Sequence, residues 1–249
     1  MRTTASTRSH RRRAALVGAA AVACAAQPAL ADERAEARTV LFGSLDAGRS
    51  SFLQAGLKHA PAGLTASGFT LLAGIGYGAR TERDRSPQAH PSSRPPRVMR
   101  HTAAGYAVAG WQWVQDWGIA ALFAGPEAGA EAVGGAGAGR PLRVGLRLHG
   151  EIWAHPTAGT LATATLIAGS ARADLWGRLS WGWHALGAYL GPEASLYADR
   201  TGYRKWSLGL HATDAGIMGL RARLSAGWLF EEQIRRPGLY AALTLWRPL

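Results

Sequence analysis

The sequence contains a single cysteine, Cys24, among 249 residues, and this excludes a fold held together by disulfide bonds within the chain. After Ala31, no stretch approaches the roughly 20 apolar residues that a membrane-spanning helix needs. The sequence also lacks a P-loop, a dinucleotide-binding glycine pattern and a cysteine–histidine metal motif. We therefore expect no bound metal and no cofactor, and we expect membrane helices to be absent from the fold.

The first 31 residues differ from the rest of the chain. A basic head with five arginines precedes 13 apolar residues, Ala14 to Ala26, and Ala29-Leu30-Ala31 matches a small-x-small cleavage site. This pattern predicts a secretory signal peptide, residues 1–31, that is cleaved after Ala31. A lipoprotein signal would need leucine three residues before Cys24, where Ala21 stands instead. The mature chain, residues 32–249, is predicted to form one domain.

The charge of the mature chain is positive. Of the 28 basic residues, 23 remain after the five arginines of the head are removed, against 16 acidic residues, so the net charge is +7. In an exported protein, such a charge suits anionic lipid headgroups or another polyanion. We therefore expect the outer membrane and its lipopolysaccharide as partners, and no contact with nucleic acid.

Apolar and polar residues alternate along most of the mature chain. The clearest case is residues 142–152, where one side is apolar (Leu142, Val144, Leu146, Leu148, Ile152) and the other is polar or small (Arg143, Gly145, Arg147, His149, Glu151). Segments of about ten residues with one lipophilic face are typical of transmembrane β-strands. Soluble β-sandwiches also alternate, but their strands are usually shorter, at roughly 5–6 residues.

Twelve segments of this kind can be counted, near residues 39–47, 51–59, 67–78, 102–113, 117–127, 141–153, 160–169, 174–183, 187–198, 203–212, 216–229 and 238–247. They predict an all-β fold, an antiparallel up-and-down transmembrane barrel closed by pairing of the first and last segments. An even strand number places both ends in the periplasm, and the two longest connections, 79–101 and 128–140, then lie on the outer side. The predicted location is the outer membrane of a Gram-negative bacterium.

Tryptophan is unusually frequent and lies near the predicted strand ends. We expect Trp113, Trp117, Trp153, Trp183 and Trp246 to form a girdle at the periplasmic edge. Trp206, Trp228 and Phe230 would form the girdle at the outer edge. Aromatic rings prefer the headgroup level of a bilayer, which is why barrels carry two such belts.

One tetrapeptide occurs twice, as Gly125-Pro126-Glu127-Ala128 and Gly191-Pro192-Glu193-Ala194, on two strands that run in the same direction. Proline within a strand removes a ladder donor and usually marks a bulge or bend. Both copies should turn a glutamate into the lumen. The two glutamates could act as a functional pair of carboxylates, but we favour a structural role in which they balance lumen arginines.

The alternation predicts which residues line the lumen and could contact a glycan. They are Glu127, Arg143, Arg147, His149, Glu151, Asp174, Trp176, Arg178, Tyr189, Glu193, Tyr197, Lys205, His211, Arg221 and Arg223. Arginine, tyrosine and tryptophan side chains can bind a sugar chain, but the same set can form a solvated ion-pair network, which is the simpler interpretation. We expect Asp199, Arg200, Arg204 and Lys205 at the outer rim, in contact with water.

Catalysis is the third possibility, because some outer-membrane lipid hydrolases use serine and histidine. The candidates are four histidines and three serines: His149, His155, His184, His211, Ser180, Ser195 and Ser207. No nucleophile elbow occurs, and no serine and histidine stand at a telling spacing. A non-enzymatic protein is therefore expected, with no catalytic residue.

Four long stretches resemble the bacterial cellulose biosynthesis protein BcsS family: Leu41–Leu64, Gly110–Glu127, Leu148–Trp183 and Tyr189–Asp214. The most specific is DRTGYRKWSLGLHATD, Asp199 to Asp214. The resemblance implies an accessory role in cellulose synthesis and secretion, with the cellulose chain and other secretion components as possible partners. A structural or docking barrel and a pore for glucan or small solutes both remain open, and a lipid hydrolase is the least favoured alternative.

Overall fold

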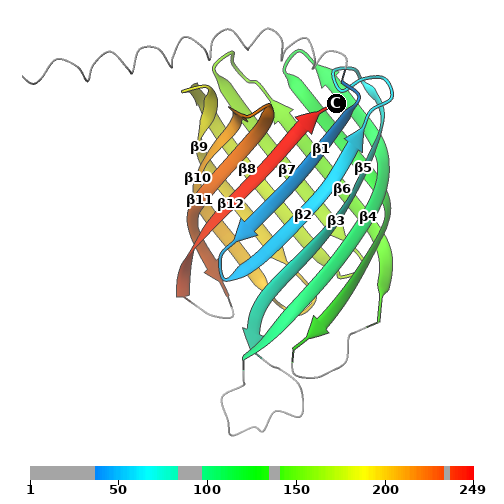
Figure 1. Ribbon diagram of the computed structural model, residues 1–249, viewed down its shortest axis with the longest axis vertical. Helices are drawn as coiled ribbons and strands as arrows, with labels where there is room; N and C mark the ends of the chain where they lie inside the picture. Colours follow the sequence, from blue (N-terminus) through cyan, green and yellow to red (C-terminus); the bar gives the residue numbers. More distant parts are fainter. Residues whose placement is uncertain (1–36, 84–96, 135–140, 233–235) are drawn as a thin grey trace, which may run out of the picture.

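The computed structural model describes residues 37–83, 97–134, 141–232 and 236–249. These residues form twelve antiparallel strands that close into a barrel (Figure 1). The strands are β1 (Thr39–Ala47), β2 (Ser50–His59), β3 (Gly68–Arg83), β4 (Arg97–Gln115), β5 (Gly118–Val133), β6 (Arg143–Ala154), β7 (Thr160–Gly169), β8 (Asp174–Ala185), β9 (Ala188–Ala198), β10 (Arg204–Ile217), β11 (Leu220–Glu231) and β12 (Arg236–Pro248). The predicted fold class is confirmed, and each of the twelve predicted segments overlaps one strand.

Closure follows from the pairing of β1 with β12, which runs from Val40 opposite Pro248 to Ala47 opposite Ala241. Every strand therefore has two neighbours, so no sheet edge is left without hydrogen-bond partners. The described residues include no helix with the length and hydrophobicity to cross a bilayer. The predicted signal peptide, residues 1–31, lies outside the described residues.

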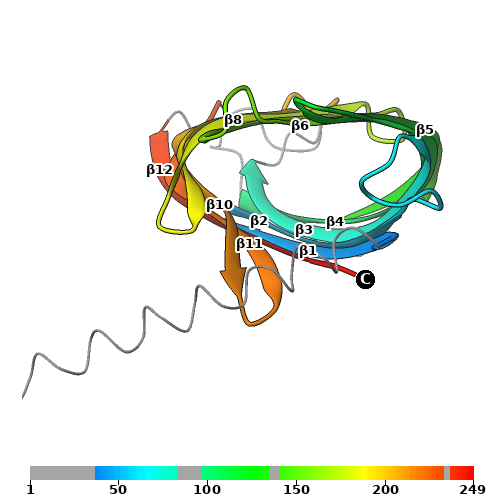
Figure 2. The ribbon, with the colours of Figure 1, turned by 90° about the horizontal axis from the view of Figure 1, so that it is seen from above.

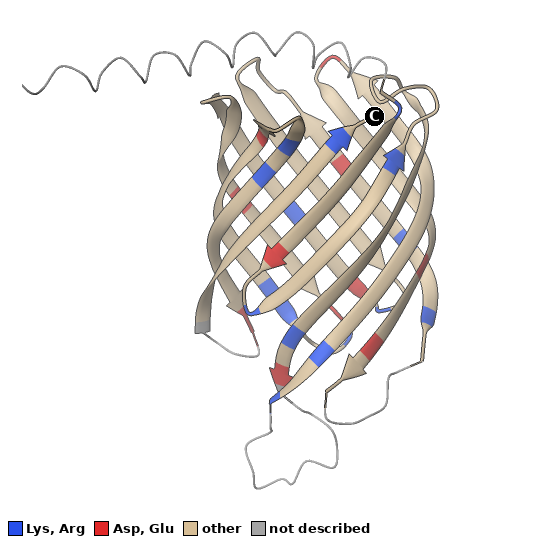
Figure 3. Cartoon of the chain, in the orientation of Figure 1, with Lys and Arg blue, Asp and Glu red and all other residues tan. Residues whose placement is uncertain are grey.

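The outer wall is apolar, as the alternation predicts. Leu146, Leu179 and Ile75 are 69%, 64% and 70% exposed, respectively, and many further leucines and tryptophans share that face. A soluble protein rarely exposes a continuous apolar surface of this kind, whereas a barrel in lipid requires it. Charged residues of both signs are interspersed over the strands and not gathered on one side (Figure 3).

The two ends of the barrel differ. We call the end at which β1 begins and β12 finishes the terminal end; there the amide of Leu249 donates to the carbonyl of Thr39. We call the opposite end the loop end. Seen end-on, the barrel is oval, and the β10–β11 hairpin leans away from the wall (Figure 2). An oval cross-section brings opposite walls closer together than a circular one of the same strand number.

Several boundaries were predicted too short. β3, β4 and β5 continue beyond the expected segments toward the loop end, so Arg80, Glu82 and Arg100 lie in strands and not in a loop. β10 also runs on to Ile217, with a β-bulge between Thr213 and Ala215. Much of each predicted long loop, residues 84–96 and 135–140, lies outside the described residues.

The repeated Gly-Pro-Glu motif interrupts the ladder without a bulge, so of the expected bulge or bend, the bulge is wrong. The β4–β5 and β8–β9 ladders each skip two residue pairs beside the motif and then resume in the same register. Pro126 and Pro192 explain the missing donors. The adjoining glycines are needed because a Cβ on Gly125 or Gly191 would collide with the backbone of the preceding strand. Both glutamates, Glu127 and Glu193, are buried inside the barrel, as predicted.

The prediction of a girdle at the terminal end is wrong for two tryptophans. Trp153 and Trp246 line the cavity inside the barrel and do not face lipid. Their position follows the alternation itself, because Ile152 and Leu148 point outward and Trp153 therefore points inward. Trp113, Trp117 and Trp183 are 44–56% exposed, which agrees with a girdle.

Ala222 is an exception to the predicted faces. It shares the outward phase of Leu224 but is fully buried, whereas Leu224 is 48% exposed. Ala222 pairs with Ala215, directly after the β-bulge of β10. A bulge bends its strand and increases the local twist, so the wall at this point departs from regular geometry.

Candidate functional site: a lumen crossed by three sets of contacts

The barrel encloses a cavity of about 850 Å³ that is lined by residues from the terminal end to the loop end. Val40, Trp246 and Pro248 line it at the terminal end, and Ser50 and Lys205 line it at the loop end. Because the lining spans the barrel, this cavity is the candidate functional site. Three sets of contacts cross it, and they determine what could pass.

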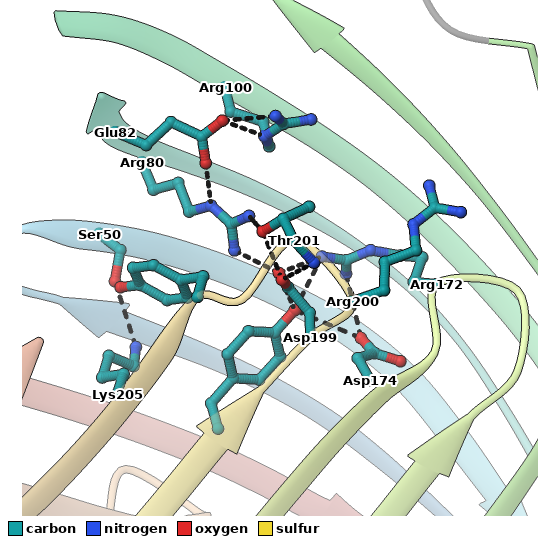
Figure 4. Close-up of polar contacts among 12 residues, drawn as sticks. Ser50, Arg80, Glu82, Arg100, Arg172, Asp174, Asp199, Arg200, Thr201 and Lys205 are labelled. Carbon is teal, nitrogen blue, oxygen red and sulfur yellow. Dashed lines mark hydrogen bonds and ion pairs between the residues drawn. The ribbon is translucent and has the colours of Figure 1, made fainter. Parts of the chain in front are cut away.

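The first set is at the loop end, where the turn between β9 and β10 reaches across the lumen. We call this turn, Asp199–Tyr203, the lid. The Asp199 carboxylate accepts a hydrogen bond of 2.6 Å from Nη1 of Arg80 on β3 (Figure 4). Five strands separate β3 from β9 in either direction around the barrel, so this contact joins opposite walls. Arg80 also donates to the hydroxyl of Thr201 at 3.1 Å.

The lid is a compact turn that local bonds hold in place. The Gly202 amide donates to the Asp199 carbonyl at 3.0 Å, and the Thr201 amide donates to the Asp199 carboxylate at 2.8 Å. Gly202 has a φ of 72°, which glycine adopts without strain. At the end of the lid, the Tyr203 hydroxyl donates to Glu231 at 2.7 Å, and the Arg80 guanidinium lies 4.2 Å from the Tyr203 ring centroid.

Ion pairs extend the lid contacts around the loop end. Arg100 pairs with Glu82 and with Glu131, and Arg172, in the β7–β8 turn, lies 3.5 Å from Glu131 and 3.3 Å from Asp174. Arg80, Arg100 and Arg172 line the cavity, whereas Glu82, Glu131 and Asp199 are absent from its lining. The arginines thus lie between the cavity and these carboxylates, and the ion pairs of Arg80 and Arg100 with Glu82 can be followed in Figure 4.

Two opposing effects act on the pKa of Asp199, the acidic residue of the lid. Loss of solvent alone would raise the pKa of Asp199, but the Thr201 hydrogen bonds and the Arg80 charge outweigh it and hold that pKa below its usual range. Asp199 is therefore ionised at neutral pH. The prediction that Asp199 meets water at the rim is wrong, because its side chain is 2% exposed. Arg204, whose side chain is 68% exposed beside Glu232, does face solvent.

The second crossing lies nearer the terminal end. Lys58 on β2 forms an ion pair with Glu151 on β6, and three strands separate the two. Both side chains are largely buried in the lumen, at 15% and 18% exposure. His149 is beside them, with its ring packed edge-on against Phe123 at 5.7 Å. Neither ring nitrogen of His149 has a hydrogen-bond partner among the described residues.

The third crossing is aromatic and lies at the terminal end. The rings of Trp153 on β6 and Trp246 on β12 meet edge to face, with centroids 5.8 Å apart. β6 and β12 are also opposite walls, with five strands between them in either direction. The two tryptophans therefore narrow the terminal mouth of the cavity.

A further buried network fixes the wall formed by β7, β9, β11 and β12. Arg223 donates to Glu193 at 2.6 Å and to the Thr163 hydroxyl at 3.2 Å. Glu193 also accepts from Ser225 at 3.0 Å and from Tyr240 at 2.8 Å. Likewise, Glu127 lies 3.8 Å from Arg147. Both repeated glutamates thus contact lumen arginines, as the structural interpretation of the motif expects.

Most of the predicted lumen residues line the cavity: Glu127, Arg147, His149, Glu151, Asp174, Trp176, Arg178, Tyr189, Tyr197, Lys205 and Arg223. Four do not. Glu193 and His211 are buried behind its surface, Arg221 bonds to the Asp214 carbonyl at 3.1 Å, and Arg143 lies at the start of β6.

The residues that close the lumen were mostly missed. Arg80, Glu82 and Arg100 fall within the predicted connection 79–101. Arg172 falls between two predicted segments, where the structure also has a turn, but it was not predicted to reach the lumen. The sequence does contain a signal for the longer strand, because the period of two continues along β3 through Gly76, Gly78, Arg80 and Glu82. The groups considered for catalysis are not assembled. Ser180 bonds to Thr163 and Ser195 to Ser207, both at 2.7 Å, and no serine–histidine hydrogen bond is found in the described ranges.

Comparison with known proteins identifies the family. Residues 40–249 match the family described as cellulose biosynthesis protein BcsS. The chain belongs to the BcsS family. The match covers all twelve strands except the first residue of β1, and it confirms the resemblance seen in the sequence. The BcsS-family barrel is therefore a protein related to cellulose synthesis. No curated protein matches the chain.

Among solved structures, the BcsS-family chain is similar to the translocator domain of the autotransporter NalP from Neisseria meningitidis. The sequence identity is 14%, the TM-score is 0.48, and the similarity covers 94% of this chain and 97% of that one.

Proposed function

We propose that this BcsS-family barrel is a non-enzymatic accessory protein of the outer membrane that supports cellulose secretion while its lumen stays closed. The single observation that carries the proposal is the Arg80–Asp199 contact, which joins opposite walls through a lid ordered by its own hydrogen bonds. The Lys58–Glu151 and Trp153–Trp246 contacts obstruct the lumen twice more. A chain of glucose units could cross only if all three opened.

The charge of the lumen supports the same conclusion. Cellulose is neutral, so a net charge of +7 on the mature chain gives it no electrostatic guidance. Four of the basic side chains in the lumen instead pair with the protein's own carboxylates: Lys58, Arg80, Arg147 and Arg223. A supporting role, either in docking other secretion components or in holding the glucan, is therefore favoured over transport.

The alternative is a pore for glucan or small solutes. It is favoured by the extent of the cavity, whose lining runs from one end of the barrel to the other. Lipid hydrolysis is the weakest candidate, because the serines considered for it bond to other hydroxyl groups. No residue is proposed to be catalytic.

The proposed location is the outer membrane, after cleavage of residues 1–31, with the terminal end in the periplasm. The apolar outer wall and the short terminal-end turns support it. Trypsin added to intact cells is expected to cut first between Arg83 and Arg97, where the chain links β3 to β4 on the outer side. Cleavage only after permeabilisation would reverse the orientation.

Deletion of the coding sequence in a cellulose-producing cell tests the function. We expect less cellulose outside the cell, unchanged synthase activity in isolated inner membranes, and recovery when the protein is supplied again. Unchanged secretion in the deletion strain would contradict an accessory role in export.

A further inference from the structure

The position of two tryptophans inside the lumen is not explained by contact with the membrane. Tryptophan on the outer wall is explained by the headgroup region, but Trp153 and Trp246 lie inside a polar lumen. If Trp153 and Trp246 served only to plug the lumen, apolar side chains around them would be sufficient. Here, Gln115, Asp116 and Asp214 line the same cavity at the terminal end.

Below the pair, the inner face of β6 presents buried polar atoms that lack partners. Trp153, Glu151, His149 and Arg147 occupy alternate positions of β6 and share its inward face. Neither ring nitrogen of His149 has a hydrogen-bond partner among the described residues, and the same holds for Nε of Arg147. The side chain of His149 is only 9% exposed. His149 also lies 3.9 Å from Glu151, and Arg147 lies 3.8 Å from Glu127. Buried polar atoms normally find partners, so two cavity-lining side chains that keep unpaired atoms can turn to bind a polar occupant.

We propose that the terminal mouth of the lumen is a binding site for a β-linked glucan, in which Trp153 and Trp246 stack on the sugar rings. Equatorially substituted glucose units have flat apolar faces that suit tryptophan, and rims of hydroxyl groups that suit His149, Glu151 and Arg147. The ligand is neutral, which agrees with a site that contains both acids and bases. The site rests on the proposed function, and it specifies the form of support: the barrel holds a glucan at its periplasmic mouth without passing it.

The edge-to-face contact describes the site without sugar. At 5.8 Å between centroids and an interplanar angle of 71°, the edge of one ring covers an apolar face of the other. A sugar ring would have to replace this contact, so at least one indole must turn when the glucan binds. Binding should therefore change the tryptophan fluorescence of the protein.

Titration of the purified full-length barrel with cellohexaose tests the proposal. The detergent must have no sugar headgroup, because a glycosidic detergent would compete for the site. We expect saturable binding by calorimetry, together with a change in tryptophan fluorescence. Trp153→Ala should weaken binding by about tenfold or more, the scale of one lost aromatic contact.

Two variants separate stacking from general damage. Trp153→Phe keeps an aromatic face and should retain most of the affinity. Trp183→Ala removes a tryptophan at the same end of the barrel whose side chain faces outward and is 56% exposed, and it should bind cellohexaose like the unmodified protein. Heat-modifiable gel mobility confirms that each variant is folded before it is titrated.

Three outcomes would overturn the site. They are no binding of cellohexaose to the folded unmodified barrel, equal binding by Trp153→Ala, and equal loss of binding by Trp183→Ala. None of these would touch the accessory role, which the deletion strain tests separately. Conversely, tight cellohexaose binding together with unchanged secretion in the deletion strain would support the binding site and contradict the accessory role in cellulose secretion.

Discussion

Leu224→Arg is expected to prevent assembly of the barrel. Leu224 lies on the lipid-facing side of β11 and is 48% exposed. An arginine on this face costs about 2–4 kcal/mol at the bilayer midplane, a large fraction of the stability of a protein of this size. The measurement is the fraction of protein that shows heat-modifiable mobility in outer-membrane preparations, and this fraction should fall close to zero.

The neighbouring position provides the matched control. Arg223 points the other way, is 4% exposed and donates to Glu193. Arg223→Leu should still assemble, because leucine is accepted inside or outside a barrel, but with lower stability. Glu193 keeps its hydrogen bonds from Ser225 and Tyr240 in this variant, so the loss should be smaller than the roughly 3–5 kcal/mol that a buried charge costs when its pair is broken and it has no other partner. Glu193→Leu combined with Arg223→Leu should recover part of that loss. Normal assembly of Leu224→Arg would mean that the faces of β11 are reversed.

Asp199→Ala is expected to open the loop end of the lumen. The substitution removes the carboxylate that accepts from Arg80 and from the Thr201 amide, so it breaks both the cross-lumen contact and the turn. In a planar lipid bilayer, the variant should show frequent conducting events, whereas the unmodified barrel should show few. Arg204→Ala, which changes an exposed side chain next to the lid, is the control and should behave like the unmodified barrel.

The same contact predicts a pH dependence. The pKa of Asp199 is lower when the lid is formed than when it is free, so the lid is fully stabilised at neutral pH. That stabilisation is lost as the pH falls through the lowered pKa, and openings should increase only under strongly acidic conditions. Asp199→Ala should not show this acid response. Conductance of the variant equal to that of the unmodified barrel would show that the lid does not limit the lumen.

The wall of the barrel could be predicted from the sequence because lipid on one side and a polar lumen on the other impose a period of two. Leu142 to Ile152 shows this rule in its clearest form, and β6 follows it. Strand ends were harder to place. Arg80 and Glu82 continue the period of two along β3. Because they lie past the apolar part of the strand, their charges resemble those of a loop.

The contacts across the lumen could not be predicted in the same way. Alternation shows that Lys58 and Glu151 both point inward, but it does not show that they meet. That depends on the shear of the strands and on the oval shape of the barrel, which are properties of the closed sheet (Figure 2). The lid is a stronger example, because nothing in the stretch from Asp199 to Tyr203 indicates that it folds inward.

The ion conductance of the unmodified, purified barrel in a planar bilayer at neutral pH shows whether contacts between the walls keep the lumen closed. We expect rare, brief openings and no sustained current. A steady ohmic current that cello-oligosaccharides block would contradict it, because an open lumen that admits glucan would make this barrel a conduit.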